Sequence, residues 1–496
     1  MPVPKSQDLP ELFIPDDSRW ASRAAGRGEI RRLARGLYST NLSEAPARLV
    51  RRRWYDVAAL YFPAAVDRSA AAAGPATDGS LFIDVGRRPI NPRPVALPGL
   101  TLRPRSGPGP VAGDVPFAGL RMASPARIAL DNLRPSRARA SVSRTLRREE
   151  LEERLDRLAR IRGSEALNEL RDQARVIAPA LDAHAQFVRL DELVGALLGT
   201  RDADLRTSAA RARRAGLPYD TERPALFETL RRELAAETFA ERAAPPDPRR
   251  LFAFFEAYFS NWIEGTVFEV EEAEDIVFAG RVPPQRPADA HDILGTFDAV
   301  TDARLGEVAP DDEDALEDYL RAAHRRIMGG RPAAVPGGYK ERANRAGLTF
   351  FVHPEVRGTL REGFSLLATL LPGLPRAVFA MFLVAEVHPF TDGNGRVARL
   401  LMNAELSAAG LCRVMVPPVY RDEYLAALRA LSQNGNPTPV WRMLDRAQRW
   451  AALMPWTSRD RVLELMNQTK SLATPEQAAA DNVHLRDPSA RGMPAG

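Results

Sequence analysis

One segment of this 496-residue chain brings together several residue types that bind anions or transfer protons: His388-Pro389-Phe390-Thr391-Asp392-Gly393-Asn394-Gly395-Arg396-Val397-Ala398-Arg399. It follows an apolar run at 377–387, and Pro389 ends a helix that enters it. The two glycines around Asn394 let the backbone turn several N–H groups toward one point, where the next helix begins. The segment therefore predicts a loop between two helices that binds an anion.

The side chains around this loop indicate which anion it binds. On the helix expected from Asn394, Arg396 and Arg399 share a stripe beside the apolar face, so two guanidinium groups flank the loop. Asp392 is a hard oxygen ligand of the kind that Mg²⁺ takes together with phosphate oxygens. His388, neutral near pH 7, could accept a proton from an incoming hydroxyl. These residues favour phosphoryl or nucleotidyl transfer with a magnesium-bound nucleotide.

The same run resembles the Fic motif (filamentation induced by cAMP), which reads histidine-proline-phenylalanine, two residues, glycine-asparagine-glycine-arginine, two residues, arginine. The resemblance covers roughly residues 247–450. It implies a mainly α protein with an all-helical Fic core and a small β-hairpin flap, expected at 338–354. It also implies an enzyme that transfers AMP from ATP, with Mg²⁺, to a Ser, Thr or Tyr hydroxyl of a target protein.

The resemblance assigns a role to each residue of the motif. His388 would be the catalytic base, and Asp392 would bind Mg²⁺. The kinase-like branch of the family carries lysine at position 395, so the glycine there favours AMP transfer. The remaining residues would hold the loop and the phosphates: Phe390 anchors the loop, Gly393, Asn394 and Gly395 cradle the α- and β-phosphates, Arg396 contacts the γ-phosphate and Arg399 supports the phosphate end.

A second motif lies upstream of the first. Apolar residues at helical spacing predict a helix over 248–265, with Asp247 as its cap and Pro248 in its first turn. It ends Ser260-Asn261-Trp262-Ile263-Glu264-Gly265, which resembles the inhibitory motif of Fic proteins whose inhibitory helix precedes the core. Ser260, Glu264 and Gly265 are its defining positions. By that resemblance Glu264 pairs with Arg396 and holds the enzyme inactive, although Glu264 could also be a plain polar residue at a helix end.

Positive charge is concentrated in the first third of the chain. Residues 1–150 hold 25 basic and 14 acidic side chains, so the remainder of the chain, with 44 and 50, is net acidic. A helix, a Gly26-Arg27-Gly28 turn, a second helix over 29–35 and an extended 37–39 are expected here, and this order resembles the winged helix of AbiEi-type antitoxins. Arg31, Arg32 and Arg35 would then face double-stranded DNA. A solvated arginine-rich surface produced by coding bias remains the alternative.

The expected organisation has four parts. A small α+β winged-helix-like region at 1–135 precedes a helical connector at 136–246, the Fic domain with its inhibitory helix at 247–450, and a partly disordered tail at 451–496. No apolar run is long enough for a bilayer span, the N-terminus does not read as a secretory signal, and the single cysteine, Cys412, cannot close an internal disulfide. We therefore expect a cytoplasmic protein that does not enter the membrane.

Two alternative functions and the oligomeric state stay open at this point. The same site could remove AMP from a modified target, with Glu264 orienting a water molecule. The chain could instead act as a DNA-binding transcriptional regulator that uses a nucleotide for sensing. The sequence also leaves open whether the protein forms a homodimer.

Overall fold

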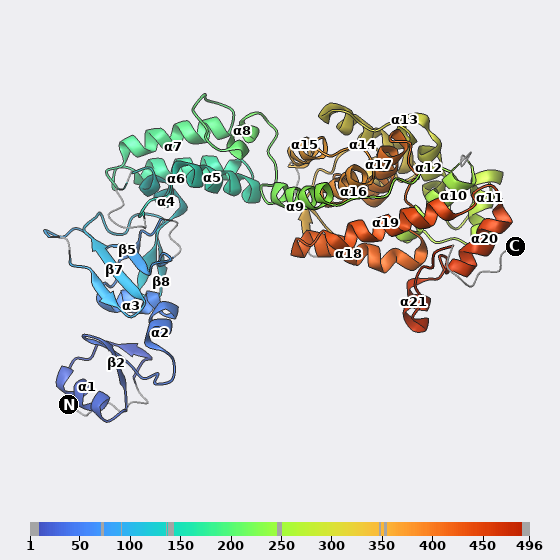
Figure 1. Ribbon diagram of the computed structural model, residues 1–496. Helices are drawn as coiled ribbons and strands as arrows, with labels where there is room; N and C mark the ends of the chain where they lie inside the picture. The colour runs from blue at the N-terminus through green and yellow to red at the C-terminus, as the bar shows by residue number, and fades with distance from the viewer. Residues whose placement is uncertain are drawn as a thin grey trace. The chain divides into compact units, whose positions relative to one another are not determined.

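A computed structural model describes residues 9–70, 74–90, 92–134, 136, 143–245, 250–346, 349–351 and 355–488. The chain divides into two compact units, Met1–Gly216 and Leu217–Gly496. Figure 1 shows the first in blue to green and the second in green to red. Helices dominate and the sheets are small, which confirms the predicted mainly α fold class.

The chain begins with a three-stranded sheet and one helix. Strands β1 (Leu12–Phe13), β3 (Leu37–Ser39) and β2 (Arg31–Ala34) pair in that order, antiparallel, and helix α1 (Ser18–Gly26) is capped by the side chain of Asp17. The predicted second helix over 29–35 is wrong, because most of this stretch forms β2 of a hairpin that turns at Gly36 (φ 82°). A seven-residue helix gains few hydrogen bonds for its nucleation cost, whereas strand pairing satisfies the same backbone groups.

A six-stranded mixed sheet follows in the same unit. Its order is β6-β7-β5-β4-β9-β8, in which β5 with β7 and β4 with β9 run parallel. Strands β8 and β9 form a hairpin that turns at Ala118 and Gly119. The elements are α2 (Pro46–Arg52), α3 (Trp54–Tyr61), β4 (Val66–Asp67), β5 (Ser80–Asp84), β6 (Val95–Leu97), β7 (Leu100–Arg105), β8 (Val115–Phe117), β9 (Leu120–Met122) and α4 (Pro125–Asn132).

The predicted helical connector is divided between the two units. Helices α5 (Arg148–Arg162), α6 (Glu165–Ile177), α7 (His184–Leu197) and α8 (Ser208–Arg214) share a hydrophobic core with α4 in the first unit. Helix α9 (Arg223–Ala236) lies in the second unit, where it packs on α15 (Val356–Leu367) and α16 (Leu374–Val387).

The second unit is almost entirely helical. Its remaining helices are α10 (Leu251–Ile263), α11 (Val270–Ala279), α12 (Pro287–Thr301), α13 (Ala303–Gly306), α14 (Glu313–Ile327), α17 (Asn394–Ala408), α18 (Arg421–Asn434), α19 (Thr438–Leu453), α20 (Arg459–Thr469) and α21 (Pro475–Asp481), with short 3-10 turns η2 (Pro332–Ala334) and η3 (Pro418–Tyr420). The flap expected from the sequence is present as a hairpin of β10 (Asn344–Ala346) and β11 (Thr349–Phe351). Residues 347–348 and 352–354 of that expectation lie outside the described residues.

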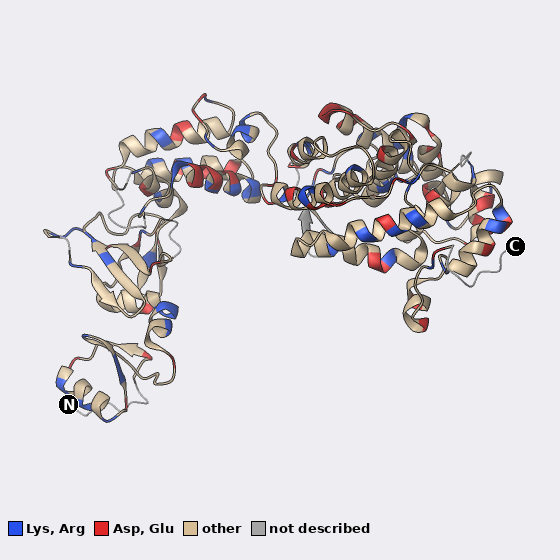
Figure 2. Ribbon diagram, viewed as in Figure 1, with Lys and Arg blue, Asp and Glu red and all other residues tan. Residues whose placement is uncertain are grey.

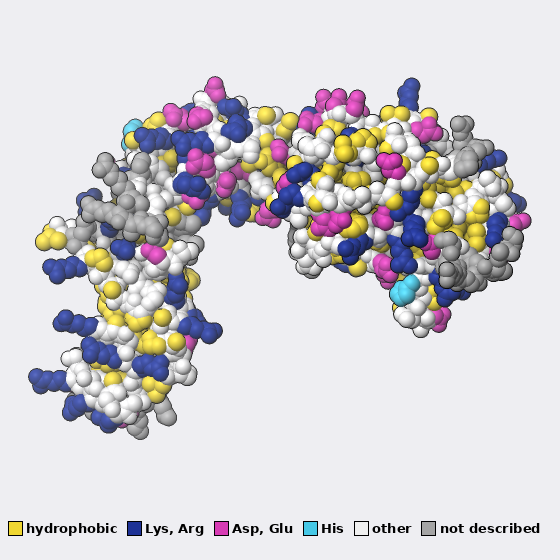
Figure 3. Space-filling view, in the orientation of Figure 1, with side chains coloured by type: hydrophobic (Ala, Val, Ile, Leu, Met, Phe, Trp, Pro, Cys, Tyr) yellow, Lys and Arg dark blue, Asp and Glu magenta, His cyan; other side chains and the backbone are white. Residues whose placement is uncertain are grey.

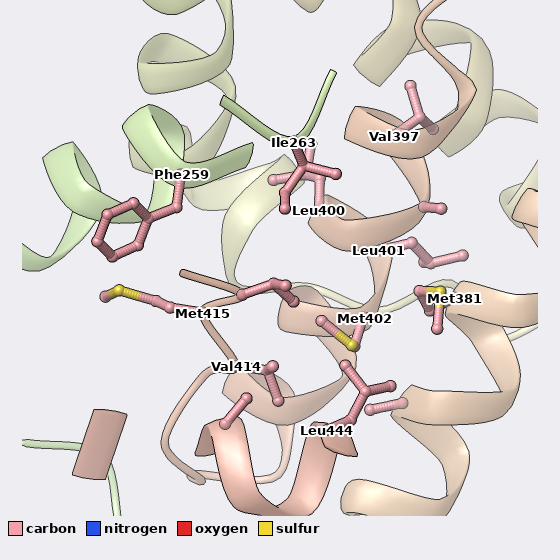
Figure 4. Packing of buried hydrophobic residues seen from close by; sticks show 14 of the residues in the cluster. Phe259, Ile263, Met381, Val397, Leu400, Leu401, Met402, Val414, Met415 and Leu444 are labelled. Carbon is pink, nitrogen blue, oxygen red and sulfur yellow. The ribbon is translucent and has the colours of Figure 1, made fainter. Parts of the chain in front are cut away.

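The core of this unit surrounds α16 and α17, which pack side by side. Figure 4 shows Val397, Leu400 and Leu401 of α17 among Ile263 of α10, Met381 of α16 and Leu444 of α19. The apolar face expected for the helix that starts at Asn394 is therefore the face that packs. Because this face is fixed in the core, the first turn of α17 and its two arginines are held in place.

The C-terminal part contributes to this core as well. Trp456, Val462, Met466 and Leu485 are all buried, so residues 451–488 of the expected tail pack into this core. Residues 489–496 lie outside the described residues. Within the described part of the chain, no helix is long and apolar enough to cross a membrane.

Candidate active site

The histidine-to-arginine segment forms the loop between α16 and α17. His388 caps α16 with a left-handed backbone (φ 52°), and its N–H donates to the carbonyl of Val384 at 3.0 Å. Gly393, also left-handed (φ 77°), precedes the first residue of α17. Left-handed backbone at a non-glycine residue is uncommon, and it persists only where the surrounding structure holds it. The loop is therefore fixed at both ends.

Two side chains hold the loop from inside. The Asn394 side chain accepts the N–H of Phe390 and donates to the carbonyl of the same residue, both at 2.8 Å. The buried ring of Phe390 stacks on His324 of α14, with ring centroids 3.8 Å apart and planes 1° apart. The ring of Phe390 therefore holds the loop against α14. The amide of Asn394 holds the loop too, which leaves the backbone N–H of Asn394 for contact with a phosphate.

His324 links the loop to the segment that precedes the flap. Its Nδ1 accepts the N–H of Gly337 at 2.9 Å, so Nε2 carries the proton that bonds to the carbonyl of Asp392 at 3.1 Å. Burial lowers the pKa of His324 to about 4, so the ring is neutral at pH 7. Nothing in its sequence spacing indicated this role.

An anion nest opens at the start of α17. The N–H groups of Asn394, Gly395 and Arg396 come before the first helical bond, which Val397 makes to the carbonyl of Gly393. These donors and the helix dipole favour negative charge. The Asp392 carboxylate beside them accepts the N–H of Gly393 at 2.6 Å, and its side chain is 56% exposed. The site thus offers donors for phosphate oxygens and one accessible carboxylate.

Residues at the end of α10 bind the side chain of Arg399, one of the two arginines of this nest. Arg399 is 6% exposed and donates to Ser260 Oγ at 3.0 Å, to the Ser260 carbonyl at 2.8 Å and to Glu264 Oε1 at 2.8 Å. Ser260 and Glu264 are four residues apart, so they lie on one face of the helix end and reach one guanidinium. Gly265, with φ 92°, is the left-handed residue that follows Glu264. All three predicted inhibitory positions therefore lie at one point.

Glu264 also fills space within the nest. A Cβ atom added to Gly395 would collide with its Oε1, so glycine at 395 is what lets this carboxylate approach the first turn of α17. Burial tends to raise the pKa of Glu264, but the charge and hydrogen bond of Arg399, with the charge of Arg396, outweigh it and hold the pKa below its ordinary value. The group is an anion at neutral pH, held within the nest.

The predicted partner of Glu264 was Arg396, and in the structure it is Arg399. Arg396 instead pairs with Asp292 of α12 at 2.8 Å and donates to Asn261 Oδ1 at 3.3 Å. Asp292 is 1% exposed and also binds Arg331 at 2.8 Å, which makes it a buried carboxylate between two guanidinium groups. The sequence missed Asp292 and Arg331 because they lie more than 50 residues from the motif and carry no spacing signal.

His388 lies between charges of both signs. Burial, and then the charge of Lys340, lowers its pKa to about 4, against the opposing effect of Glu264 and Asp392. Lys340 stands just before the flap, and its backbone N–H donates to the carbonyl of Pro389 at 2.9 Å. The imidazole is thus neutral at pH 7, the form that can accept a proton.

Comparison with protein families matches residues 314–406 to the Fic/DOC family. This range runs from α14 to α17 and includes the whole loop described above. Residues 314–406 form a Fic domain.

Curated relatives of this Fic domain carry related names. Over 236 residues, or 45% of this chain and 46% of the relative, the chain is 29% identical to "Protein adenylyltransferase fic-1" of Caenorhabditis elegans. Over 247 residues, or 48% of each protein, it is 26% identical to "Protein adenylyltransferase Fic" of Drosophila persimilis. The chain thus spans about half the length of the curated relatives it matches. Among solved structures, "Fic-1 (aa134 - 508) from C. elegans" is 22% identical with a TM-score of 0.35, covering 64% of this chain and 92% of that one.

The structure gathers most of the predicted site residues around the Fic domain. The motif residues lie within it, and Ser260, Glu264 and Gly265 reach it from α10. The predicted cap of that helix, Asp247 with Pro248, and residues 248–249 of its expected span lie outside the described residues. Arg31, Arg32 and Arg35 belong to the first unit, where Arg31 donates to the carbonyl of Glu44 at 2.7 Å.

Proposed function

We propose that this chain is a protein adenylyltransferase, which transfers AMP from ATP to a Ser, Thr or Tyr hydroxyl of a target protein and rests in an inhibited state. One observation carries the proposal. A carboxylate from α10 is bound to Arg399 within an anion nest that the Fic loop builds beside a neutral histidine. A site that binds a carboxylate of its own chain this closely can also bind an anionic group of similar shape on a ligand.

The proposed reaction uses the residues of the loop in order. The N–H groups of Asn394, Gly395 and Arg396 would hold the phosphates of ATP. His388 would take the proton of the target hydroxyl as its oxygen forms a bond to the α-phosphorus, and the bond to the β-phosphate oxygen breaks to release pyrophosphate. Arg396 and Arg399 would neutralise the charge that develops on the leaving group. The flap would hold the target segment by main-chain hydrogen bonds.

A magnesium ion fits this proposal through Asp392. Its carboxylate is exposed beside the nest, and Mg²⁺ commonly takes one or two carboxylates with phosphate oxygens and water as its other ligands. Across the described ranges, no three His, Cys, Asp or Glu side chains gather into a metal site, so the nucleotide would bring most of the ligands. The ion would supply charge neutralisation at the phosphates.

Inhibition would act through Arg399. While Ser260 and Glu264 hold this guanidinium, a triphosphate cannot also use it, and the carboxylate repels the phosphate end. ATP would then bind with its α-phosphate away from the hydroxyl, so the hydroxyl and the α-phosphorus would not be aligned for transfer.

The test is labelling of the full chain with ATP that carries a label on its α-phosphate. Glu264→Gly should raise self-modification by at least about tenfold, the effect of losing one charged hydrogen bond of roughly 1.5 kcal/mol or more. Glu264→Gly with His388→Ala should abolish the label, and mass spectrometry should find added AMP in the single variant only.

Glu269→Gly is the matched control, because Glu269 is an exposed glutamate five residues further along that precedes α11. Its labelling should equal that of the wild type. Equal labelling of wild type and Glu264→Gly would contradict the inhibition. If the wild type instead releases AMP from a modified target and Glu264→Gly does not, removal of AMP is the main activity.

We also propose that the first unit binds double-stranded DNA through its N-terminal hairpin. Arg32 and Arg35 are exposed on this hairpin, and Arg19 and Arg23 are exposed on α1. Figure 2 shows the basic residues along these elements, and Figure 3 shows the blue side chains that gather over this unit. Arg52 and Arg53 contribute less, because they pair with Glu11, Glu44 and Asp56.

An electrophoretic shift of a labelled duplex tests this second proposal. Arg32→Ala with Arg35→Ala should weaken binding, and wild-type affinity should fall steeply between about 50 and 200 mM salt because phosphate contacts dominate it. The control is Arg157→Ala with Arg189→Ala, which removes two exposed arginines from α5 and α7. No retardation of the wild type at the lower salt would reject DNA binding. The cytoplasmic location and the homodimer stay predictions.

A further inference from the structure

Lys340 is a buried lysine that the motif does not account for. It is 2% exposed, although lysine is among the residues that proteins bury least. It comes immediately before the flap and is one of three lysines in a chain that uses arginine almost everywhere else. A buried ammonium group is costly unless the surroundings or a function retain it.

The contacts of Lys340 join the flap to the loop that carries His388. Its backbone N–H donates to the carbonyl of Pro389 at 2.9 Å, and its Nζ donates to Asn344 Oδ1 at 2.9 Å. Asn344 is the first residue of β10, and its Nδ2 donates to the carbonyl of Phe390 at 3.4 Å. Lys340 and Asn344 therefore attach the base of the flap to two successive residues that follow His388.

The backbone bond of Lys340 to Pro389, the residue after His388, keeps Lys340 close enough for its charge to act on the imidazole. Among the described residues, the cation Lys340 and the carboxylates of Glu264 and Asp392 act on His388 with opposite effects on its pKa. Around Lys340 itself, Arg223 of α9 is the charge that acts on it, and Arg223 pairs with Glu386 at 3.2 Å and Asp220 at 3.7 Å. A cation on this side of the ring disfavours a second positive charge on His388.

We propose that Lys340 is a positioning residue for AMP transfer, which locks the base of the flap to the catalytic loop and places a buried ammonium group beside the His388 imidazole. The flap then presents the target hydroxyl at a fixed height over the loop, and the histidine remains a proton acceptor in mildly acidic conditions. This inference rests on the proposed function.

Burial lowers the pKa of the Lys340 ammonium to about 7, with a further contribution from Arg223. The Lys340 ammonium is charged below pH 7, which is the pH range in which His388 could become protonated. Above pH 7 the ammonium loses its proton, but His388 is neutral there in any case. The two groups are therefore matched to keep the base available from about pH 4 upward.

The first experiment measures the titration of His388 without any transfer. NMR of the full chain labelled at histidine should give the pKa of His388 in Glu264→Gly and in Glu264→Gly with Lys340→Met, and His388→Ala identifies its signal among the six histidines. We expect the pKa of His388 to rise when the ammonium is removed, while burial, the larger cause, still holds it below the ordinary value of about 6.5. An unchanged pKa would overturn the electrostatic part of the proposal.

The second experiment measures the pH dependence of self-labelling in the same variants. Lys340→Met should move the acid limb of the rate upward by at least one pH unit and lower the rate at pH 7 by about tenfold, while the affinity for ATP changes less than about twofold. Lys340→Arg, which keeps the charge, should keep the acid limb near its original pH. An unchanged rate and profile in Lys340→Met would overturn the proposal.

Asn344→Ala separates the two parts and keeps the test open if Lys340→Met does not fold. It retains the ammonium and the bond from Lys340 to Pro389 but removes the bond from Asn344 to Phe390, so the rate should fall at least about fivefold with the acid limb unmoved. An unchanged rate would overturn the positioning part. If Glu264→Gly itself takes no label, the proposed function fails, and the NMR titration still decides the effect of Lys340 on His388.

Discussion

Arg399 is the residue on which the inhibited state depends. Arg399 donates three hydrogen bonds to the end of one helix: to the Ser260 hydroxyl, to the Ser260 carbonyl and to the Glu264 carboxylate. The side chain of Glu264 keeps 28% of its exposure, whereas that of Arg399 keeps 7%. The glutamate can therefore leave toward solvent more easily than the arginine can move. Release of the inhibited state is a motion of Glu264.

His324 makes the stability of the second unit depend on pH. Its pKa of about 4 in the folded chain lies below the ordinary value of about 6.5, so the folded state binds fewer protons than the unfolded state between these values. The free energy of unfolding should therefore fall as the pH drops from about 6.5 to about 4. For this fully buried ring the loss is of the order of 3 kcal/mol.

Chemical unfolding at pH 7 and at pH 4.5 measures this loss. His324→Gln should be less stable than wild type at pH 7, because it loses the stacking on Phe390, but its stability should fall less on acidification. His484→Gln is the control, since His484 is exposed in the same unit and should leave the pH dependence unchanged. Equal acid sensitivity of wild type and His324→Gln would assign the effect to other groups.

At the scale of elements, α10 is part of the core and does not act as a separate lid. Phe252 through Ile263 are all buried, and their rings pack on Trp450 and Trp456. Removing the helix would expose several aromatic side chains, at about 1.5 to 3 kcal/mol for each one. Activation should therefore leave α10 in place and move only its last turn.

Hydrogen exchange tests where the chain opens on activation. With ATP and Mg²⁺, the Glu264→Gly variant should differ from the wild type at residues 260–266, while the amides of 251–259 stay protected in both proteins. Exchange that rises along the whole of α10 would show that the helix undocks. The control is Glu269→Gly, which should match the wild type throughout.

The sequence predicted the elements around the loop well but not the tertiary links between them. Proline, two glycines and the apolar spacing of α17 act within a dozen residues, so the loop and both helix ends were predictable. The Fic domain, its flap and the position of Ser260 and Glu264 followed from motifs. Asp292, His324 and Lys340 act through contacts between distant segments, which no local spacing reveals. The choice between Arg396 and Arg399 failed for the same reason.

Interactions with distant parts of the chain also decide the structure of two other segments. Residues 29–35 have a composition that suits a helix or a strand, and pairing with β3 decided for the strand. The tail at 451–488 is polar and rich in alanine, but a few well-spaced apolar residues such as Trp456 and Leu485 bury it. In both segments the deciding interaction is made with a part of the chain that a local pattern does not contain.

At the scale of the whole molecule, the two units carry separate cores and separate charge. The first has its apolar clusters around the six-stranded sheet and around α4 to α8, and the second has one large cluster around α16 and α17. The excess of arginine belongs to the first unit, while the proposed catalytic machinery belongs to the second. The two proposed activities can therefore be removed one at a time by substitution.

The burial of Arg399 has a consequence for any version of this protein that escapes inhibition. A guanidinium enclosed in the interior is destabilising when its counter-ion is taken away. A permanently active form would contain a buried guanidinium without its counter-ion. Its folding stability would then depend on the concentration of triphosphate in the cell.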